Sequence, residues 1–164
     1  MKNETIQKKR VEVSVGIIEN DKNEILVCRR NKKGDHLFGL LEFPGGKVEK
    51  GETIVDCLIR ELYEEVDINL PSSSSSSSSS FSSNDDSTSF SLIKLIEIVE
   101  FEYKDIICNI HFFKVNLQNN TTQQISPKPK EGQPMFWIKK NEIDYLQFPE
   151  SNKNVIELLN QNKI

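Results

Sequence analysis

The sequence predicts an α/β (α+β) fold in which helices cover a mixed β-sheet. Three strand-like segments precede one strongly amphipathic helix, further strand-like segments follow it, and a second helical pattern lies near residue 160. Strands interrupted and followed by helices are typical of a sheet sandwiched between helices. The length of 164 residues suits one domain with a sizeable core, so we expect residues 1–164 to form a single domain.

The first strands form a hairpin. Residues 11–18 alternate apolar side chains toward one face, a polar turn covers 20–23, and residues 24–30 give a second strand. After a polar loop, residues 40–43 predict a short strand that ends at the Pro-Gly-Gly of 44–46. This last strand leads directly into the most informative part of the chain.

A helix is predicted from residue 52 or 53 to residue 66. Its core-facing residues are Ile54, Val55, Leu58, Ile59, Leu62 and Val66. Residues 71–91 are of low complexity and include nine consecutive serines at 72–80. Such a segment buries too little apolar area to offset its ordering entropy, so we expect a disordered insertion there.

The second half of the chain returns to a strand pattern. The predicted elements are strands at 92–103, 106–117 and 134–139, a polar loop at 116–131, and a helix from 152 or 154 to about 161. The first two of these strands are joined near residues 104–105, so we expect them to pair.

Charge and composition exclude several classes of function. The net charge of −4 argues against sequence-independent binding of long nucleic acid. No apolar run is long enough to span a membrane. Cys28, Cys57 and Cys108 show no paired spacing, so we expect free thiols in a reducing compartment. We expect a cytoplasmic monomer, with the nuclear and mitochondrial pools as alternative locations.

The loop and helix at residues 46–65 carry the chemistry. They read GKVEKGE, then seven residues, then RELYEE. Glu61, Glu64 and Glu65 stand at i, i+3 and i+4, so on a helix they share one face and repel one another. A multivalent cation would remove this conflict, and magnesium prefers carboxylate oxygens completed by water and substrate phosphate.

This spacing resembles the Nudix box: Gly, five residues, Glu, seven residues, Arg-Glu, an apolar residue, any residue, Glu-Glu, any residue, Gly, apolar. The matching residues are Gly46, Glu52, Arg60, Glu61, Leu62, Glu64, Glu65 and Ile68. Asp67 replaces the late glycine, which commonly ends the helix in a left-handed conformation. We expect this aspartate to cost roughly 1 kcal/mol and activity to be retained. The alternative, an amphipathic helix with a solvated acidic face, requires neither the arginine nor the preceding Phe-Pro-Gly-Gly.

The resemblance extends over nearly the whole chain except the serine tract, and is closest to the MutT-type 8-oxo-dGTP diphosphatases. Residues 41–49, 130–134 and 148–152 look like that group's box entry, late loop and purine-reading segment. The resemblance implies an α/β/α sandwich with a mixed, partly barrel-like sheet. It also implies hydrolysis of a nucleoside diphosphate derivative by attack of water on phosphorus.

The resemblance implies a Mg²⁺ site, with Mn²⁺ as the alternative. Its expected ligands are Glu61, Glu64, Glu65, the carbonyl of Gly45 and Glu131. Arg60 is expected to orient a box carboxylate through a bidentate contact. Glu52 is either an outer-sphere ligand or a structural carboxylate that holds the loop. Bound metal would lower the pKa of the attacking water. Glu61 is a candidate base for that water as well as a metal ligand.

For the nucleotide substrate, the resemblance implies conversion of 8-oxo-dGTP to 8-oxo-dGMP and pyrophosphate. Lys47 and Arg30 are expected near the phosphates. Asn152 either reads O6 and N7–H of the oxidised base through its amide or caps the last helix. Phe43 either walls the base pocket or belongs to the core. Other nucleoside diphosphate derivatives remain alternative substrates, and a catalytically silent binding module is the alternative class; the presence of all four box glutamates favours the enzyme.

Overall fold

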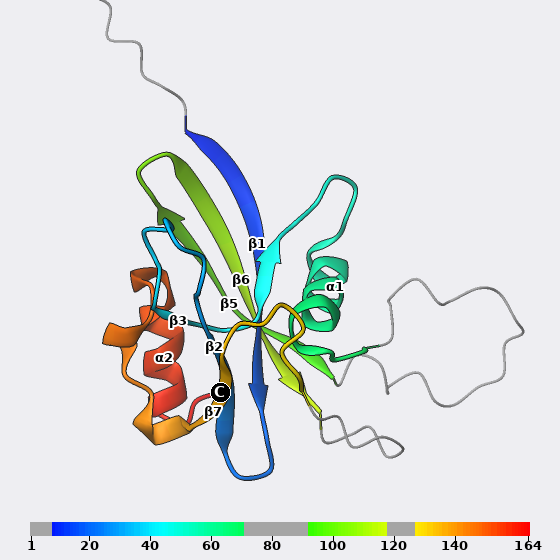
Figure 1. Ribbon diagram of the computed structural model, residues 1–164, viewed down its shortest axis with the longest axis vertical. Helices are drawn as coiled ribbons and strands as arrows, with labels where there is room; N and C mark the ends of the chain where they lie inside the picture. The colour runs from blue at the N-terminus through cyan, green and yellow to red at the C-terminus, as the bar shows by residue number, and fades with distance from the viewer. Residues whose placement is uncertain (1–7, 71–91, 118–126) are drawn as a thin grey trace, which may run out of the picture.

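The computed structural model describes residues 8–70, 92–117 and 127–164 (Figure 1). The insertion predicted at 71–91 lies outside these ranges. The described elements are β1 (Lys9–Glu19), β2 (Glu24–Arg29), β3 (Leu41–Glu42), β4 (Gly45–Lys47), α1 (Ile54–Val66), β5 (Ile93–Glu102), β6 (Ile106–Asn116), β7 (Met135–Lys139), the 3₁₀ turns η1 (Lys140–Glu142), η2 (Tyr145–Gln147) and η3 (Glu150–Asn152), and α2 (Lys153–Asn160).

The strands form one open, mixed sheet in the order β3-β2-β1-β6-β5, with β4 paired to β1 and β7 paired to β2. The β1 and β6 strands are parallel over their full length, and the other pairs are antiparallel. The predicted β1–β2 hairpin is confirmed, although its strand pairing is confined to the turn end at Glu19 and Ile25. Nearer the N-terminus of β1, at residues 13–15, the neighbouring strand is β4 instead of β2, so β2 and β4 diverge from each other there (Figure 1).

The two helices cover opposite faces of the sheet, as the sequence predicts for a sandwich (Figure 1). One core cluster joins β1, β2 and β6 to Val155, Ile156 and Leu159 of α2. The other joins alternate residues of the same strands to α1. Close packing against α1 requires Gly16, because a Cβ there would lie 3.1 Å from Leu62 Cδ2.

The predicted start of α1 at residue 52 or 53 is one or two residues early. The helix begins at Ile54, and Thr53 is its N-cap: Thr53 Oγ1 accepts the Asp56 N–H at 3.1 Å. At the other end, Asp67 adopts φ 59° and ψ 32°, which confirms the expected left-handed conformation. The Ile68 N–H then donates to the Leu62 carbonyl at 3.0 Å, and the Asp67 N–H donates to the same carbonyl, so both bonds close the end of the helix.

The β4 strand is a correction to the predicted end of the strand region at residues 44–46. Gly45 and Gly46 pair with Val15 and Ser14 of β1. Two adjacent glycines carry no side-chain pattern that could reveal a strand, and their partners lie 30 and 32 residues away in the chain. This strand places Gly46, the first residue of the glycine–glutamate–arginine spacing, directly against β1 in the sheet.

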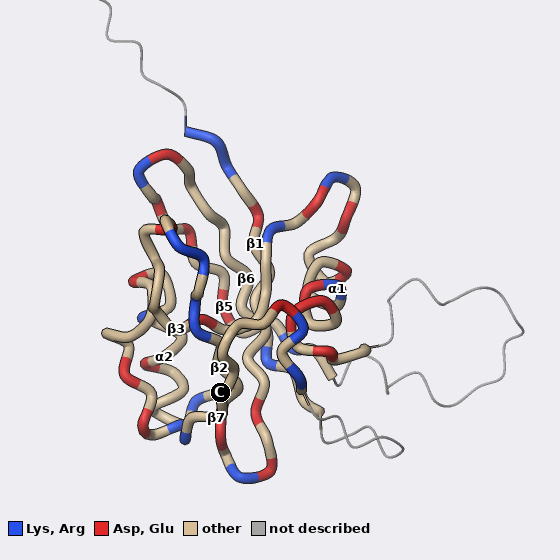
Figure 2. The backbone as a smooth tube through the Cα atoms, viewed as in Figure 1, with Lys and Arg blue, Asp and Glu red and all other residues tan. Residues whose placement is uncertain are grey.

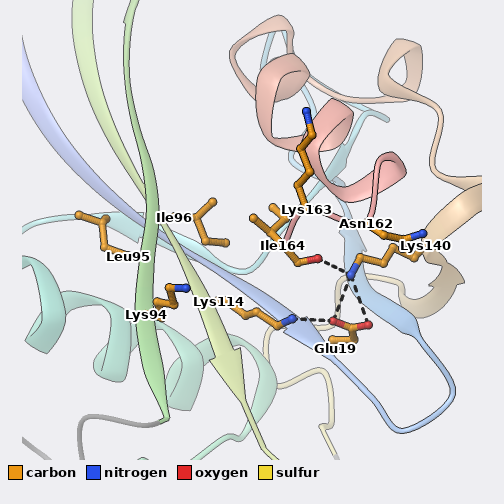
Figure 3. Close-up of a pocket in the computed structure, with 9 residues that line it drawn as sticks. All are labelled: Glu19, Lys94, Leu95, Ile96, Lys114, Lys140, Asn162, Lys163 and Ile164. Atoms are coloured by element: carbon orange, nitrogen blue, oxygen red, sulfur yellow. Dashed lines mark hydrogen bonds and ion pairs between the residues drawn. The ribbon is translucent and has the colours of Figure 1, made fainter.

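A cavity of about 470 Å³ lies beside the C-terminal end of β1 (Figure 3). The Glu19 carboxylate in this cavity forms ion pairs with Lys114 Nζ at 3.1 Å and with Lys140 Nζ at 3.4 Å. Lys140 also donates to the carbonyl of Ile164. These contacts fasten β1 and β6 to η1, and we interpret them as structural.

The three cysteines are free, as predicted, and all three are buried. Burial raises the pKa of the Cys28 and Cys57 thiols to about 12. Neither helix in the described part of the chain is long and apolar enough to cross a membrane.

Candidate active site

The glycine pair in β4 allows a carboxylate of α1 to lie directly on the sheet. A Cβ at Gly45 would lie 2.2 Å from the Ser14 carbonyl oxygen, and a Cβ at Gly46 would lie 2.1 Å from Glu61 Oε1. No side chain larger than hydrogen fits at either position without movement of the backbone or of Glu61. Gly45 therefore allows β4 to lie close to β1, and Gly46 allows the Glu61 carboxylate to lie against β4.

Arg60 joins the loop to three box carboxylates. It grips Glu52 with two hydrogen bonds, from Nε to Oε1 at 2.8 Å and from Nη2 to Oε2 at 3.0 Å. Its Nη1 donates to Glu61 Oε1 at 2.8 Å and to Glu64 Oε2 at 3.1 Å, and Nη2 donates to the Lys47 carbonyl at 3.2 Å. The bidentate contact expected of Arg60 is therefore made with Glu52.

Glu52 fits the structural alternative better than the outer-sphere one. Besides its two bonds from Arg60, its Oε2 accepts the Glu49 N–H at 2.9 Å, which closes the loop before the helix. The hydrogen bonds from Arg60 lower the pKa of Glu52 to about 2. A carboxylate held in this way keeps its charge and its position in the loop.

Glu65 is the most perturbed carboxyl group in this part of the molecule. Burial raises its pKa to about 8, although its Oε2 accepts the Gly45 N–H at 2.9 Å. The charges of Glu61, Glu42 and Glu131 raise it further. Burial also raises the pKa of Glu61, which Arg60 partly offsets. Carboxylates from β3, α1 and the loop before β7 thus repel one another across one small region.

This repulsion is what a cation would relieve. Within the described ranges, no three side chains of the His, Cys, Asp and Glu types are already arranged around one metal position. The fit rests instead on the donor chemistry, since buried carboxylate oxygens are the ligands that Mg²⁺ and similar hard cations prefer. Figure 2 shows the acidic residues on α1 and on the loop that leads into it.

The stability of the metal-free protein should fall as pH rises from about 4.5 to about 8. The folded state holds a proton on Glu65 in this window while the unfolded state has lost it, so each pH unit costs at most about 1.4 kcal/mol. Thermal unfolding in EDTA across this range would measure the slope. Glu65→Gln should flatten it, whereas Glu49→Gln, an exposed carboxylate in the neighbouring loop, should leave it unchanged; equal slopes in both variants would contradict this assignment.

Beside the carboxylates lies a cavity of about 830 Å³ on the α2 face of the sheet. This volume is in the range of sites for nucleotide-sized ligands. Five of the predicted site residues line it: Arg30, Phe43, Gly45, Lys47 and Asn152. The floor is apolar and comes from β1 and β6, and β4 separates the cavity from α1. The cavity is therefore suited to an aromatic base whose phosphates extend past β4.

Asn152 is buried, with 8% of its surface exposed, and its side chain makes no capping bond to α2. Its Nδ2 instead donates to the Pro149 carbonyl at 3.2 Å. The geometry thus disfavours the capping alternative and is compatible with base reading. Phe43 combines its two alternatives: it is 4% exposed, packs 5.0 Å from Phe148 between ring centroids, and also lines the cavity.

Arg30 is surrounded by carboxylates that the sequence analysis did not single out. Its Nη1 lies 2.8 Å from Asp35 Oδ2, and its Nε forms an ion pair with Glu42. Burial raises the pKa of Glu42, while Arg30 lowers it. One sequence signal for Glu42 exists, namely a lone carboxylate within an apolar strand beside Phe43. The pairing itself depends on β2 and β3 lying side by side.

The sequence analysis also did not assign Tyr103, Ser151 and His36 to the site, although all three line the cavity. The Tyr103 hydroxyl lies 3.0 Å from Ser151 Oγ, next to Asn152. The His36 ring meets Tyr103 edge-on at 5.8 Å. Both contacts join loops distant in the sequence, so no local pattern could have indicated them.

Comparison with known proteins agrees with this geometry. A NUDIX domain model matches residues 8–159. The 8-oxo-dGTP diphosphatase of Escherichia coli (strain K12) is 34% identical over 151 residues, which cover 92% of this chain and 97% of that protein. A CTP pyrophosphohydrolase of the same organism is 47% identical over 60 residues, or 37% of this chain and 43% of that one. A solved MutT structure, from work on Aliivibrio salmonicida and Vibrio cholerae, has a TM-score of 0.62 at 25% identity, covering 92% of this chain and 96% of that one.

Proposed function

The chain belongs to the Nudix hydrolase family, and from that premise we propose that it is a Mg²⁺-dependent pyrophosphohydrolase that converts 8-oxo-dGTP to 8-oxo-dGMP and pyrophosphate. Such an activity would remove an oxidised precursor from the nucleotide pool before DNA synthesis. The observation that carries the proposal concerns Asn152. This residue is buried, its side chain makes no capping bond to α2, and it lines a cavity beside the carboxylate cluster.

The proposed metal ligands are Glu61, Glu64, Glu65, the Gly45 carbonyl and Glu131. When bound, a divalent cation neutralises phosphate oxygens and lowers the pKa of water. Family members generally use such ions, and Mg²⁺ is our choice, with Mn²⁺ as the alternative. Glu131 belongs to this set because its charge raises the pKa of both Glu61 and Glu65.

The chain's own residues supply the remaining steps. The oxygen of water forms a bond to a phosphorus atom, the bond from that phosphorus to the oxygen bridging the α- and β-phosphates breaks, and the bridging oxygen departs as part of the other product. Glu61 accepts a proton from the attacking water. Arg60 holds Glu61 and Glu64 in place through the bonds described above. Lys47, which is exposed and lines the cavity, would meet phosphate oxygens. Arg30 faces the same cavity with its charge shared between Asp35 and Glu42.

Base selectivity would come from the amide of Asn152. Oxidised guanine carries a hydrogen on N7 where guanine has an acceptor, and a single amide can accept from N7–H while donating to O6. An unoxidised base would leave a buried acceptor facing another acceptor, which costs about 1 to 3 kcal/mol. This penalty corresponds to a preference of roughly fivefold to 150-fold.

The test is pyrophosphate release with Mg²⁺ from 8-oxo-dGTP, dGTP, dCTP, CTP, ADP-ribose and a dinucleoside polyphosphate. We expect kcat/KM to be highest on 8-oxo-dGTP. The short match to a CTP pyrophosphohydrolase makes cytidine nucleotides the second candidate, and preference for them would replace the first. No turnover of any substrate by the metal-bound protein would favour a silent binding module.

Asn152→Ala should reduce the preference for 8-oxo-dGTP over dGTP by about tenfold or more, with a smaller effect on kcat for the oxidised substrate. The matched control is Asn154→Ala, an exposed asparagine two residues farther along, which should keep full selectivity. Unchanged selectivity in Asn152→Ala would show that another group reads the base.

A further inference from the structure

The loop at 127–133 is fastened to the C-terminal end of α1 by two backbone hydrogen bonds. The Lys128 N–H donates to the Val66 carbonyl at 2.9 Å, and the Lys130 N–H donates to the Glu65 carbonyl at 3.0 Å. Carbonyls in the last turn of a helix have no partner within the helix. The loop therefore caps α1, and it does so at Glu65, one of the proposed metal ligands.

The Lys130 side chain adds a second attachment. Its Nζ lies 3.7 Å from the centroid of the Tyr63 ring and 3.5 Å from Asp67 Oδ1. Tyr63 and Asp67 are one helical turn apart, so the ammonium group is held between a ring face and a carboxylate. A solvent-exposed ion pair alone stabilises weakly, but here the same charge makes both contacts.

Asp67 is also the residue at which this chain departs from the box. Glycine would adopt its left-handed conformation without strain, but glycine offers no charge to Lys130. The departure therefore brings a carboxylate to the point where the loop meets the helix.

The residue that follows Lys130 is Glu131. The bond from the Lys130 N–H to the Glu65 carbonyl therefore holds the backbone next to Glu131 against the turn of α1 that carries Glu65. Gly132, with φ 74°, turns the chain immediately after Glu131. We propose that Tyr63, Asp67 and Lys130 form a clip that positions Glu131 for metal binding. This inference rests on the metal site proposed above, and the three clip residues are positioning residues that need not touch the substrate.

The first experiment measures Mn²⁺ affinity by electron paramagnetic resonance, without substrate. Lys130→Met keeps most of the side-chain length but removes the charge, and should raise the Mn²⁺ dissociation constant about fivefold. Lys130→Arg should restore near-normal affinity. The matched control is Lys128→Met: this lysine lies in the same loop, contributes a backbone bond, and has an exposed side chain.

Two further variants separate the clip from general charge effects. Asp67→Asn removes the carboxylate and tolerates the left-handed conformation, so it should weaken Mn²⁺ binding in the same way as Lys130→Met. In a Glu131→Gln background, Lys130→Met should have no additional effect, because the clip acts through Glu131.

Amide hydrogen exchange of the metal-free protein provides the readout that does not depend on the metal. Lys130→Met should increase exchange at the amides of residues 128 and 130, whose bonds join the loop to α1. Wild-type exchange and wild-type Mn²⁺ affinity in Lys130→Met would overturn the proposal, as would full additivity with Glu131→Gln. If the clip variants behave as expected while the substrate panel shows no turnover, the clip stands and the proposed function fails.

Discussion

Glu64→Gln should lower kcat/KM by at least about 100-fold while leaving the fold intact. Glutamine keeps the shape of the side chain but removes the charge that would bind a metal ion. The Glu64 side chain is 49% exposed and makes one 3.1 Å contact with Arg60, so its loss should change stability little. Steady-state kinetics with saturating Mg²⁺, together with thermal unfolding of the same sample, measure both effects.

Glu49→Gln is the control for this variant. Glu49 lies in the loop before α1, is exposed, and participates in the site only through its backbone N–H. It should retain wild-type kcat/KM. Turnover by Glu64→Gln close to that of the control would remove Glu64 from the metal site, and a large fall in its melting temperature would assign it a structural role instead.

Arg60→Met should produce the largest loss of stability among the variants considered, about 2 to 4 kcal/mol at pH 7. It leaves Glu52 and Glu61, both mostly buried, without their shared cation. The loss should shrink as pH falls from about 4.5 to 2. In wild type, the contribution of Glu52 is present above its unfolded pKa and disappears as the pH approaches its folded pKa of about 2.

Chemical denaturation at several pH values in EDTA would measure this convergence. Arg10→Met is the comparison, since Arg10 also bonds a glutamate, at 2.6 Å from Glu100, but both side chains are more than half exposed. It should leave stability close to that of wild type at every pH, because water screens an exposed ion pair. An Arg60→Met deficit that does not vary with pH would mean that packing of the arginine, rather than its pairing with Glu52, is responsible.

Local patterns carried the prediction of the helices and the long strands. The α1 boundaries differ from prediction by at most two residues, because its apolar periodicity, its Thr53 cap and the residue at 67 are all encoded nearby. The β4 strand and the Arg30–Glu42 pair could not be predicted in this way. The former consists largely of glycine, and the latter joins two strands that meet only in the folded sheet.

The candidate site shows the same division. The four box glutamates and Arg60 were predicted from spacing, and the structure brings them together on one helix and its preceding loop. The alternatives for Asn152 could not be separated by sequence, because a residue at the start of a helix has the same spacing whether it caps or points into a cavity. The observed bond to Pro149 and the missing capping bond disfavour capping, and base reading stays a proposal.

The burial of all three cysteines has a practical consequence for kinetics. Cys28 belongs to the core beneath α1, Cys108 to the core beneath α2, and Cys57 lies with its sulfur 3.6 Å from the Gly46 carbonyl. A buried thiol reacts with an alkylating reagent only during transient local opening. Each of the three thiols therefore reports on the opening of its own surroundings: one in each core and one beside the glycine pair. Measured separately, their alkylation rates would show which of these regions opens most often.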